Sequence, residues 1–380
     1  MLDGENGWAN QIAMKILTRL GDLFRATKLI PIQSAHVSGV SYKNIGDTAI
    51  DFLNELASQG GRTKTLTTLN PSSFDQEYLL NRYPKAFTAK QEHIIELYVR
   101  MLIKPTLTCT PYYLGKSEAR QHLAWSESSA VVYANSVLNA YTNREGAPSA
   151  LAAAIIGKTP NYGVHRSENR QPHVLIDLET ELQTETDYGA LGIHLGKLLK
   201  AKIPAFKGLR GSDDQLKQLG AAMAASGMTT LFHTQAPRER EKLESVSVGS
   251  REIEEAKSSL CTADQPPDLV LVGCPHCSIS EVKSVAEALG AKRVGKNTEL
   301  WICTSRHVKE RSLKYVEVIE RAGGHVICDT CVIVSWIKNL GVDTLMTNSA
   351  KTAFYAPTLN EVDVSLAPLT QCIQAACTSP

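Results

Sequence analysis

The sequence lacks any long hydrophobic run, and its apolar stretches are as short as residues 151–157. A helix that spans a membrane needs about 18 apolar residues, so no segment is a candidate membrane span. An excess of charge of one sign is also missing, because 40 Lys and Arg residues face 39 Asp and Glu residues, which gives a net charge of +1. A near-neutral chain without a basic block argues against nucleic acid or an anionic membrane as the main partner.

Residues 1–7 lack the basic and apolar regions of a signal peptide, so we expect a cytoplasmic protein. The composition is typical of a soluble globular enzyme, with 43% hydrophobic and 21% charged residues. At about 150 residues per domain, the length of 380 residues predicts two or three lobes. We place them at residues 1–150, 151–259 and 260–380.

Strands and helices alternate most clearly in the last lobe. Three short apolar runs predict strands, at residues 268–273, 300–303 and 325–328. One helix is predicted to begin at Ser278, where Glu281 completes the spacing of a capping box, and another to cover residues 306–322. The alternation predicts an α/β fold with parallel sheets and crossover helices. In such sheets ligands bind beyond the carboxyl ends of the strands, where Cys274 and Cys331 fall.

The first half mixes helices with short strands that run into polar loops. Apolar periodicity predicts helices at residues 8–24, 45–58 and 90–103. Strands are predicted at residues 28–32 and 64–68, followed by polar loops at residues 34–41 and 70–73.

Nine cysteines are an odd number, and the cytosol keeps thiols reduced, so a disulfide framework is not expected. Two Cys-x-x-Cys pairs, Cys274/Cys277 and Cys328/Cys331, could form a four-thiolate zinc site. The pairs are about fifty residues apart, whereas zinc ribbons usually separate theirs by roughly 15–20. A redox pair at Cys274 would suit a strand-to-helix turn, but it leaves Cys109 and Cys331 without a role.

A third interpretation takes one cysteine from each of three loops: Cys109, Cys274 and Cys331. Three thiolates can hold an iron–sulfur cluster and leave one iron without a protein ligand. Such an iron is a Lewis acid that can help a substrate hydroxyl leave as water, which is dehydratase chemistry. Under this interpretation Cys261, Cys303, Cys372 and Cys377 have no such role, and a cysteine in a strand, such as Cys303, is a small core residue.

A series of short motifs then identifies a resemblance. In chain order they are Gly4-Glu5-Asn6-Gly7-Trp8-Ala9, Ser34-Ala35-His36-Val37-Ser38-Gly39-Val40-Ser41-Tyr42, Thr68-Leu69-Asn70-Pro71, Cys109-Thr110-Pro111-Tyr112, Trp125-Ser126-Glu127-Ser128, Thr142-Asn143-Arg144-Glu145-Gly146, Gly273-Cys274-Pro275-His276, Asp329-Thr330-Cys331 and Thr347-Asn348-Ser349-Ala350-Lys351. Together they resemble the large subunit of the aconitase X family, over residues 1 to about 357. The resemblance implies an aconitase-like, multi-lobed α/β fold.

The family contains two kinds of enzyme. One is a fused chain that dehydrates cis-3-hydroxy-L-proline, and the other is a pair of subunits that dehydrates (R)-5-phosphomevalonate to trans-anhydromevalonate 5-phosphate in an archaeal-type mevalonate pathway. This sequence shows no appended swivelling domain, so it resembles the large subunit of the second kind. The resemblance implies a heterodimer with a small, β-rich swivelling-domain subunit that brings a catalytic serine. The hydroxyproline activity and a non-catalytic, zinc-stabilised scaffold subunit stay as alternatives.

The resemblance also implies roles for individual residues. Cys109, Cys274 and Cys331 become ligands of an iron–sulfur cluster, with 4Fe–4S expected and 3Fe–4S or 2Fe–2S as alternatives. The substrate contacts are Gly39, Val40, Ser41, Asn70, Pro71, Glu127, Ser128 and Lys351. Backbone amides at glycine-bearing turns and short polar side chains can cradle an anion, and a lysine supplies a point charge for phosphate or carboxylate.

Glu127 and Ser128 are the expected catalytic residues near the reacting carbons, and Glu127 is the base within this chain if the partner's serine is not the base. His36 and Arg144 are weaker candidates for the site. Cys277 and Cys328 stand beside expected ligands at positions where the family needs no cysteine, so they are either core residues or ligands of zinc.

Overall fold

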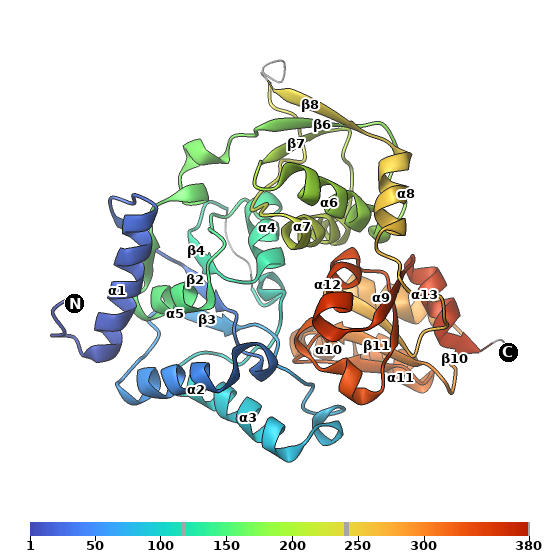
Figure 1. Cartoon of the computed structure of the whole chain (residues 1–380), viewed down its shortest axis with the longest axis horizontal. Coiled ribbons are helices and arrows are strands. Elements are labelled where there is room, and N and C mark those ends of the chain that lie inside the picture. Colours follow the sequence, from blue (N-terminus) through green and yellow to red (C-terminus); the bar gives the residue numbers. More distant parts are fainter. Residues whose placement is uncertain (116–118, 239–242, 379–380) are drawn as a thin grey trace.

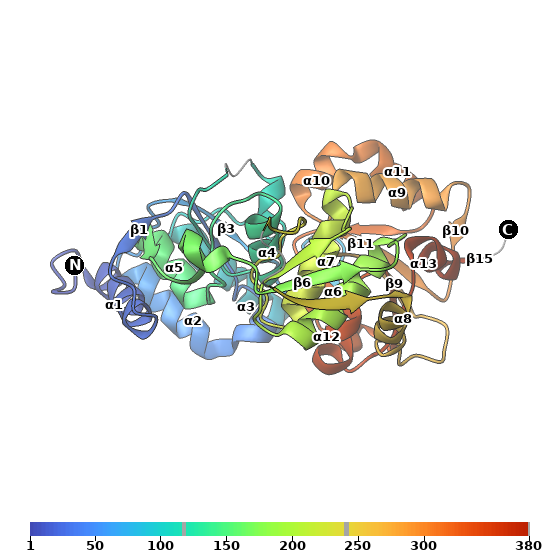
Figure 2. The same cartoon turned by 90° about the horizontal axis from the view of Figure 1, so that it is seen from above.

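Three parallel β-sheets flanked by helices form the body of the computed structural model, which describes residues 1–115, 119–238 and 243–378 (Figure 1). This arrangement confirms the α/β class with parallel sheets. Two short antiparallel pairs accompany them: β1 (Leu29–Pro31) with β5 (Lys158–Pro160), and β10 (Arg293–Val294) with β15 (Cys377–Thr378). Figures 1 and 2 place the first and last parts of the chain side by side along the long axis, with helices of the middle part near their boundary.

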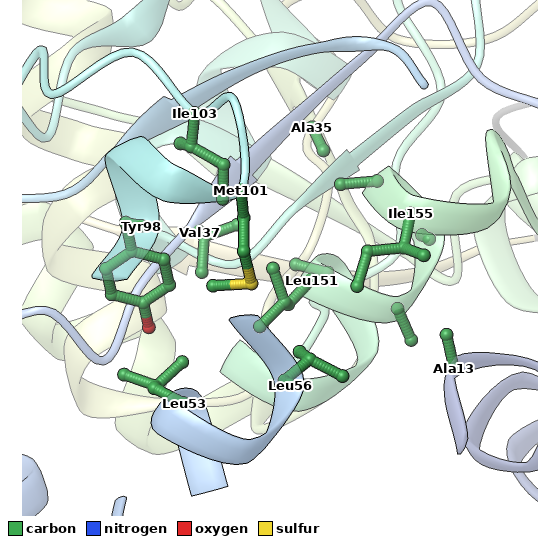
Figure 3. Packing of buried hydrophobic residues seen from close by; sticks show 14 of the residues in the cluster. Ala13, Ala35, Val37, Leu53, Leu56, Tyr98, Met101, Ile103, Leu151 and Ile155 are labelled. Atoms are coloured by element: carbon green, nitrogen blue, oxygen red, sulfur yellow. The ribbon is translucent and has the colours of Figure 1, made fainter. Parts of the chain in front are cut away.

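The first sheet has the order β3 (Leu66–Leu69), β2 (Ser34–Val37) and β4 (Leu123–Trp125). The helices of this part are α1 (Trp8–Leu23), α2 (Tyr42–Ser58), α3 (Lys85–Arg100) and α5 (Ala147–Ile156). Their apolar faces meet over the sheet, where side chains including Val37, Leu56, Met101 and Leu151 form one buried cluster (Figure 3). Burial of this continuous apolar surface fixes the strand ends that carry the polar loops.

The predicted loop at residues 34–41 is wrong in its first half, because Ser34–Val37 is the central strand β2. The polar His36 is tolerated in a central strand since its ring is hydrogen-bonded to Thr68 on β3 and to Asn70. The loop proper is therefore residues 38–41, at the carboxyl end of β2.

The middle sheet has the order β7 (Pro204–Lys207), β6 (Val174–Leu178) and β8 (Glu244–Val248). Its helices are α6 (Glu185–Leu199), α7 (Asp213–Ser226) and α8 (Ser250–Ser258). Helices α6 and α7 pack closely because glycines such as Gly192 have no Cβ. The space between the two helices has no room for one. Helix α7 also packs on α4 (Ser128–Ser136), which follows β4.

The last sheet has five parallel strands in the order β12 (His325–Ile327), β11 (Glu299–Thr304), β9 (Leu269–Cys277), β13 (Thr344–Thr347) and β14 (Asp363–Leu366). Its helices are α9 (Ile279–Leu289), α10 (Arg306–Arg311), α11 (Leu313–Arg321), α12 (Ala350–Asn360) and α13 (Leu369–Ala376). The three predicted strands are confirmed, and β9 is buried along its whole length. The predicted capping box of Ser278 and Glu281 is also present.

The single helix predicted at residues 306–322 is wrong, because the chain forms two helices that meet at Ser312. The Ser312 hydroxyl donates to the carbonyl of Val308 at 2.7 Å, and the Ser312 backbone leaves the helical region at φ −122°. A serine that bonds back to the preceding turn competes with the helix ladder. Among the helices within the described ranges, none combines the length and the apolar character needed to cross a bilayer.

Candidate functional site

A cavity of about 370 Å³ lies where the loops after β2, β3 and β4 face the last part of the chain. All eight residues predicted to contact the substrate line it: Gly39, Val40, Ser41, Asn70, Pro71, Glu127, Ser128 and Lys351. Carboxyl ends of parallel strands are the usual place for ligand sites in α/β folds. A larger cavity of about 580 Å³, beside the middle sheet, contains none of the predicted residues.

The loop after β2 keeps its shape through a glycine. Gly39 has φ +73°, a left-handed conformation that favours glycine, and a Cβ at this position would lie 2.9 Å from the Cβ of Ala147 on α5. The hydroxyl of Ser41 lies 2.7 Å from that of Ser73 and donates to the carbonyl of Val334 at 2.8 Å. The loop is thus attached to the loops that follow β3 and β12.

Glu127 and Lys351 form a buried ion pair at the cavity wall. The Lys351 ammonium lies 2.7 Å from a Glu127 carboxylate oxygen. Glu127 is the N-cap of α4 and accepts from the amide of Ser129, and Asn70 donates to its second oxygen at 3.0 Å. Burial opposes ionisation of Glu127, but the charge of Lys351 and these hydrogen bonds outweigh it and lower its pKa to about 2.

The same pairing raises the pKa of Lys351 although burial alone would lower it. Both groups are therefore charged at neutral pH. A carboxylate whose pKa is about 2 holds a proton weakly, so Glu127 in this arrangement is poorly suited to be a general base. Its contacts instead fix the ammonium of Lys351 at the cavity.

His36 lies fully buried behind Asn70 and does not form the cavity wall. Burial lowers its pKa to about 4, so the ring is neutral. Its Nε2 lies 3.3 Å from Oδ1 of Asn70, an atom that can only accept, so Nε2 carries the proton. This bond orients the Asn70 amide so that its nitrogen points at Glu127. Arg144, the other weaker candidate, does line the cavity and donates to the carbonyl of Ala224 at 3.1 Å.

Cys109, Cys274 and Cys331 are free, and all three are buried. Burial raises the pKa of Cys331 to about 12, and the neighbouring Cys274 adds to the effect. Burial also raises the pKa of Cys109, followed by the charges of Glu127 and Cys331. The three sulfurs, Glu127 and Lys351 interact electrostatically and therefore lie near one another, although they come from segments far apart in the sequence.

This donor set fits an iron–sulfur cluster. The three buried thiols come from three separate segments, because Cys274 lies in β9 whereas Cys109 and Cys331 lie in loops. The positive charge of Lys351 lowers the pKa of Cys331, although burial outweighs this effect. Within residues 1–115, 119–238 and 243–378, no group of three or more His, Cys, Asp or Glu side chains is gathered tightly enough to hold a single metal ion. Cys277 packs into an apolar cluster with Val270 and Val282, as a core residue does.

Some cavity residues were missed by the sequence analysis. Tyr355 and Leu359 lie one and two turns after Lys351 on α12, and Val334 follows Cys331. The spacing of four residues along a helix could have indicated Tyr355 once Lys351 was a candidate. Ser38 and Ser126 also line the cavity, and both stand inside motifs that the sequence analysis singled out.

Comparison with known proteins covers nearly the whole chain. Models of the aconitase X first, second and third domains match residues 1–168, 172–258 and 267–378. The phosphomevalonate dehydratase large subunit of Methanocaldococcus jannaschii is 45% identical over 96% of this chain and 95% of that protein. The cis-3-hydroxy-L-proline dehydratase of Pseudomonas aeruginosa is 34% identical over 99% of this chain and 68% of that protein.

A solved structure agrees with these relatives. The crystal structure of the holo form of aconitase X from Thermococcus kodakaraensis superimposes with a TM-score of 0.92 at 44% identity, covering 99% of this chain and 97% of that chain. The fold and the cavity at the strand ends are therefore those of a multi-lobed α/β enzyme, and the comparisons identify its family. The chain belongs to the aconitase X family, which confirms the resemblance carried by the sequence motifs.

Proposed function

We propose that this chain is the large subunit of a hydro-lyase that dehydrates (R)-5-phosphomevalonate to trans-anhydromevalonate 5-phosphate in an archaeal-type mevalonate pathway. The observation that carries the proposal is the buried Lys351–Glu127 pair at the wall of the cavity, with three buried thiols close enough to interact with it electrostatically. The name and the 45% identity of the Methanocaldococcus jannaschii relative support the choice of substrate.

In this proposal Cys109, Cys274 and Cys331 hold an iron–sulfur cluster, of the 4Fe–4S type. When bound, the cluster supplies a Lewis acid that helps the substrate hydroxyl leave as water. The part of these residues is to present three thiolates from β9 and two loops that the surrounding hydrogen bonds hold in place. The carbonyl of Cys274 accepts from the hydroxyl of Ser349, and that of Cys331 accepts from Ser335 at 2.7 Å.

The polar loops and two cations bind the anionic groups of the substrate. Lys351 offers a charge fixed by Glu127, and Arg144 offers a guanidinium held by backbone carbonyls. Ser41, Asn70 and Ser128 supply short polar groups around the reacting carbons. A fixed, partly desolvated donor set stabilises the negative charge that develops when a proton next to a carboxylate is removed.

The base in this proposal is a serine of a small, swivelling-domain partner subunit. The low pKa of Glu127, which is the candidate base within this chain, supports the choice of the partner's serine instead. A partner that closes over the cavity would also exclude water from the reaction. The Methanocaldococcus jannaschii relative is named as a large subunit, and this supports a heterodimer.

Two alternatives differ from this proposal in ways that can be measured. Dehydration of cis-3-hydroxy-L-proline uses the same chemistry on an unphosphorylated substrate, and the lower identity of 34% to the Pseudomonas aeruginosa relative makes it second. A zinc-stabilised scaffold would need Cys277 as a ligand, whereas Cys277 packs among apolar side chains.

The test is made on the chain produced anaerobically with its small-subunit partner. Iron, sulfide, zinc and the visible spectrum are measured first, and loss of water from (R)-5-phosphomevalonate is then followed by NMR. Iron with sulfide absorbance and a new alkene signal is the expected result. Zinc with a featureless spectrum would overturn the cluster, and turnover of cis-3-hydroxy-L-proline alone would overturn the substrate.

A further inference from the structure

A single histidine connects the three segments that carry the cysteines of the site, which are β9 and two loops. His276 lies in β9, two residues after Cys274, and its side chain is fully buried. Its Nδ1 lies 2.9 Å from the hydroxyl of Thr108, and its Nε2 lies 2.9 Å from the carbonyl oxygen of Thr330. Thr108 precedes Cys109, and Thr330 precedes Cys331, so the two sides of one ring contact the two other cysteine loops.

The backbone of His276 is held as firmly as its ring. Its amide donates to Sγ of Cys109 at 3.2 Å. Its carbonyl accepts from Nζ of Lys217 on α7 at 3.3 Å, and Lys217 is fully buried in an ion pair with Glu281. Each polar group of His276 therefore has a partner, and none of these bonds stays within β9.

The partners also define where the ring proton lies. The carbonyl of Thr330 can only accept, so Nε2 of His276 carries the proton. Nδ1 then accepts from the hydroxyl of Thr108, whose oxygen in turn accepts from the amide of Thr110 at 3.2 Å. The chain of bonds has one direction, from the Thr110 amide through the ring to Thr330, and every group in it is satisfied.

We propose that His276 is a positioning residue that sets the spacing of Cys109, Cys274 and Cys331 for the iron–sulfur cluster. The inference rests on the proposed function, because it requires these three cysteines to be the ligands. The hydrogen bond from the backbone amide of His276 to Sγ of Cys109 should also affect the reduction potential of the cluster. Hydrogen bonds to ligand sulfurs, and the groups that orient ligands, tune this potential. An ordinary core histidine would contribute to stability alone.

Three variants separate the two sides of the ring. His276→Asn keeps an acceptor near Nδ1 and loses the bond to Thr330, whereas His276→Gln keeps a donor near Nε2 and loses the bond to Thr108. Thr108→Val removes the hydroxyl with little change of shape, and it remains informative if a His276 variant does not fold. The matched control is His165→Asn, because His165 is also buried but its ring pairs with His122.

Each variant is produced anaerobically with the small-subunit partner, and four quantities are measured: iron and sulfide per chain, the midpoint potential, the rate at which a chelator bleaches the visible absorbance, and the melting temperature. We expect both His276 variants and Thr108→Val to bleach at least tenfold faster than wild type and to show a shifted potential. His165→Asn should lower the melting temperature without changing either cluster property.

Wild-type bleaching rate and potential in the His276 variants and in Thr108→Val would overturn the inference, even if their melting temperatures fell. A wild-type complex without iron and sulfide would instead overturn the cluster itself, and the positioning role with it. The two failures are therefore told apart by the wild-type sample alone.

Discussion

Lys351 lies 2.7 Å from Glu127, with side chains 9% and 12% exposed, and the two residues are 224 positions apart in the sequence. The pair joins the first turn of α12 to the N-cap of α4 at the wall of the cavity. A buried ion pair of this kind is stable only while both charges are present, because one buried charge without its partner has a large desolvation free energy.

Replacing one partner should therefore destabilise the chain strongly. We expect Lys351→Met to lower the free energy of unfolding by about 3–5 kcal/mol, because it leaves Glu127 buried and unpaired. The matched control is Lys338→Met, since Lys338 pairs with Asp343 at the surface, and its effect should be about 0.5 kcal/mol or less. Urea denaturation measures both, and equal effects of the two substitutions would contradict the burial argument.

The pH dependence of stability should carry the signature of Glu127. Its pKa is lowered from 4.5 to about 2, so its contribution is fully present above pH 4.5 and is lost as the pH falls from there toward 2. The shift corresponds to about 3 kcal/mol. The difference in unfolding free energy between wild type and Glu127→Gln, measured from pH 6 to pH 3, should shrink as the pH falls.

Glu145 offers a control of opposite sign. Burial raises its pKa above 4.5, so the wild-type chain should gain stability relative to Glu145→Gln as the pH falls toward 4.5. Parallel pH profiles for the two substitutions would show that Glu127 is not held ionised by Lys351.

The cysteine assignment predicts a sharp division among nine thiols. Cys109→Ser, Cys274→Ser and Cys331→Ser should each abolish the visible absorbance of the cluster and the dehydration, because each removes a proposed ligand. Cys277→Ser and Cys303→Ser should keep both, since these side chains pack in apolar clusters, and should lose only stability. Bleaching by Cys277→Ser without bleaching by Cys274→Ser would show that the ligand set is wrong.

Gly39 allows steric contact and backbone strain to be separated. Gly39→Ala should cost about 2–3 kcal/mol, because the left-handed backbone is strained and the new Cβ meets Ala147 at 2.9 Å. Gly60→Ala has the same kind of backbone, at φ +82°, with open space around it, so it should cost about 1 kcal/mol. Chemical denaturation measures both costs.

The substrate loop gives a second readout. Gly39→Ala should raise KM for the phosphorylated substrate, and the double variant Gly39→Ala/Ala147→Gly should recover part of both losses. A double variant no better than Gly39→Ala would show that contact with Ala147 is not the cause.

Local patterns in the sequence were sufficient for much of the fold. The continuous apolar run of β9, the capping box at Ser278 and the motifs at the strand ends each depend on residues near one another, so they could be read without a structure. The helix that divides at Ser312 was not predicted, because the bond from its hydroxyl to the preceding turn is one of several that a serine can make. The lobe boundaries that we placed at residues 150 and 259 stay predictions.

By itself, the sequence determined that the chain is a parallel α/β protein of the aconitase X family, and it supplied the eight predicted substrate contacts that line the cavity. The tertiary structure alone decided the protonation and the hydrogen-bond partners of these residues. Glu127 became a poor base because Lys351 approaches it, and His276 gained partners in two distant loops because those loops pack against β9. Burial and the charge of distant neighbours set pKa values and hydrogen-bond direction, and neither is visible in a local pattern.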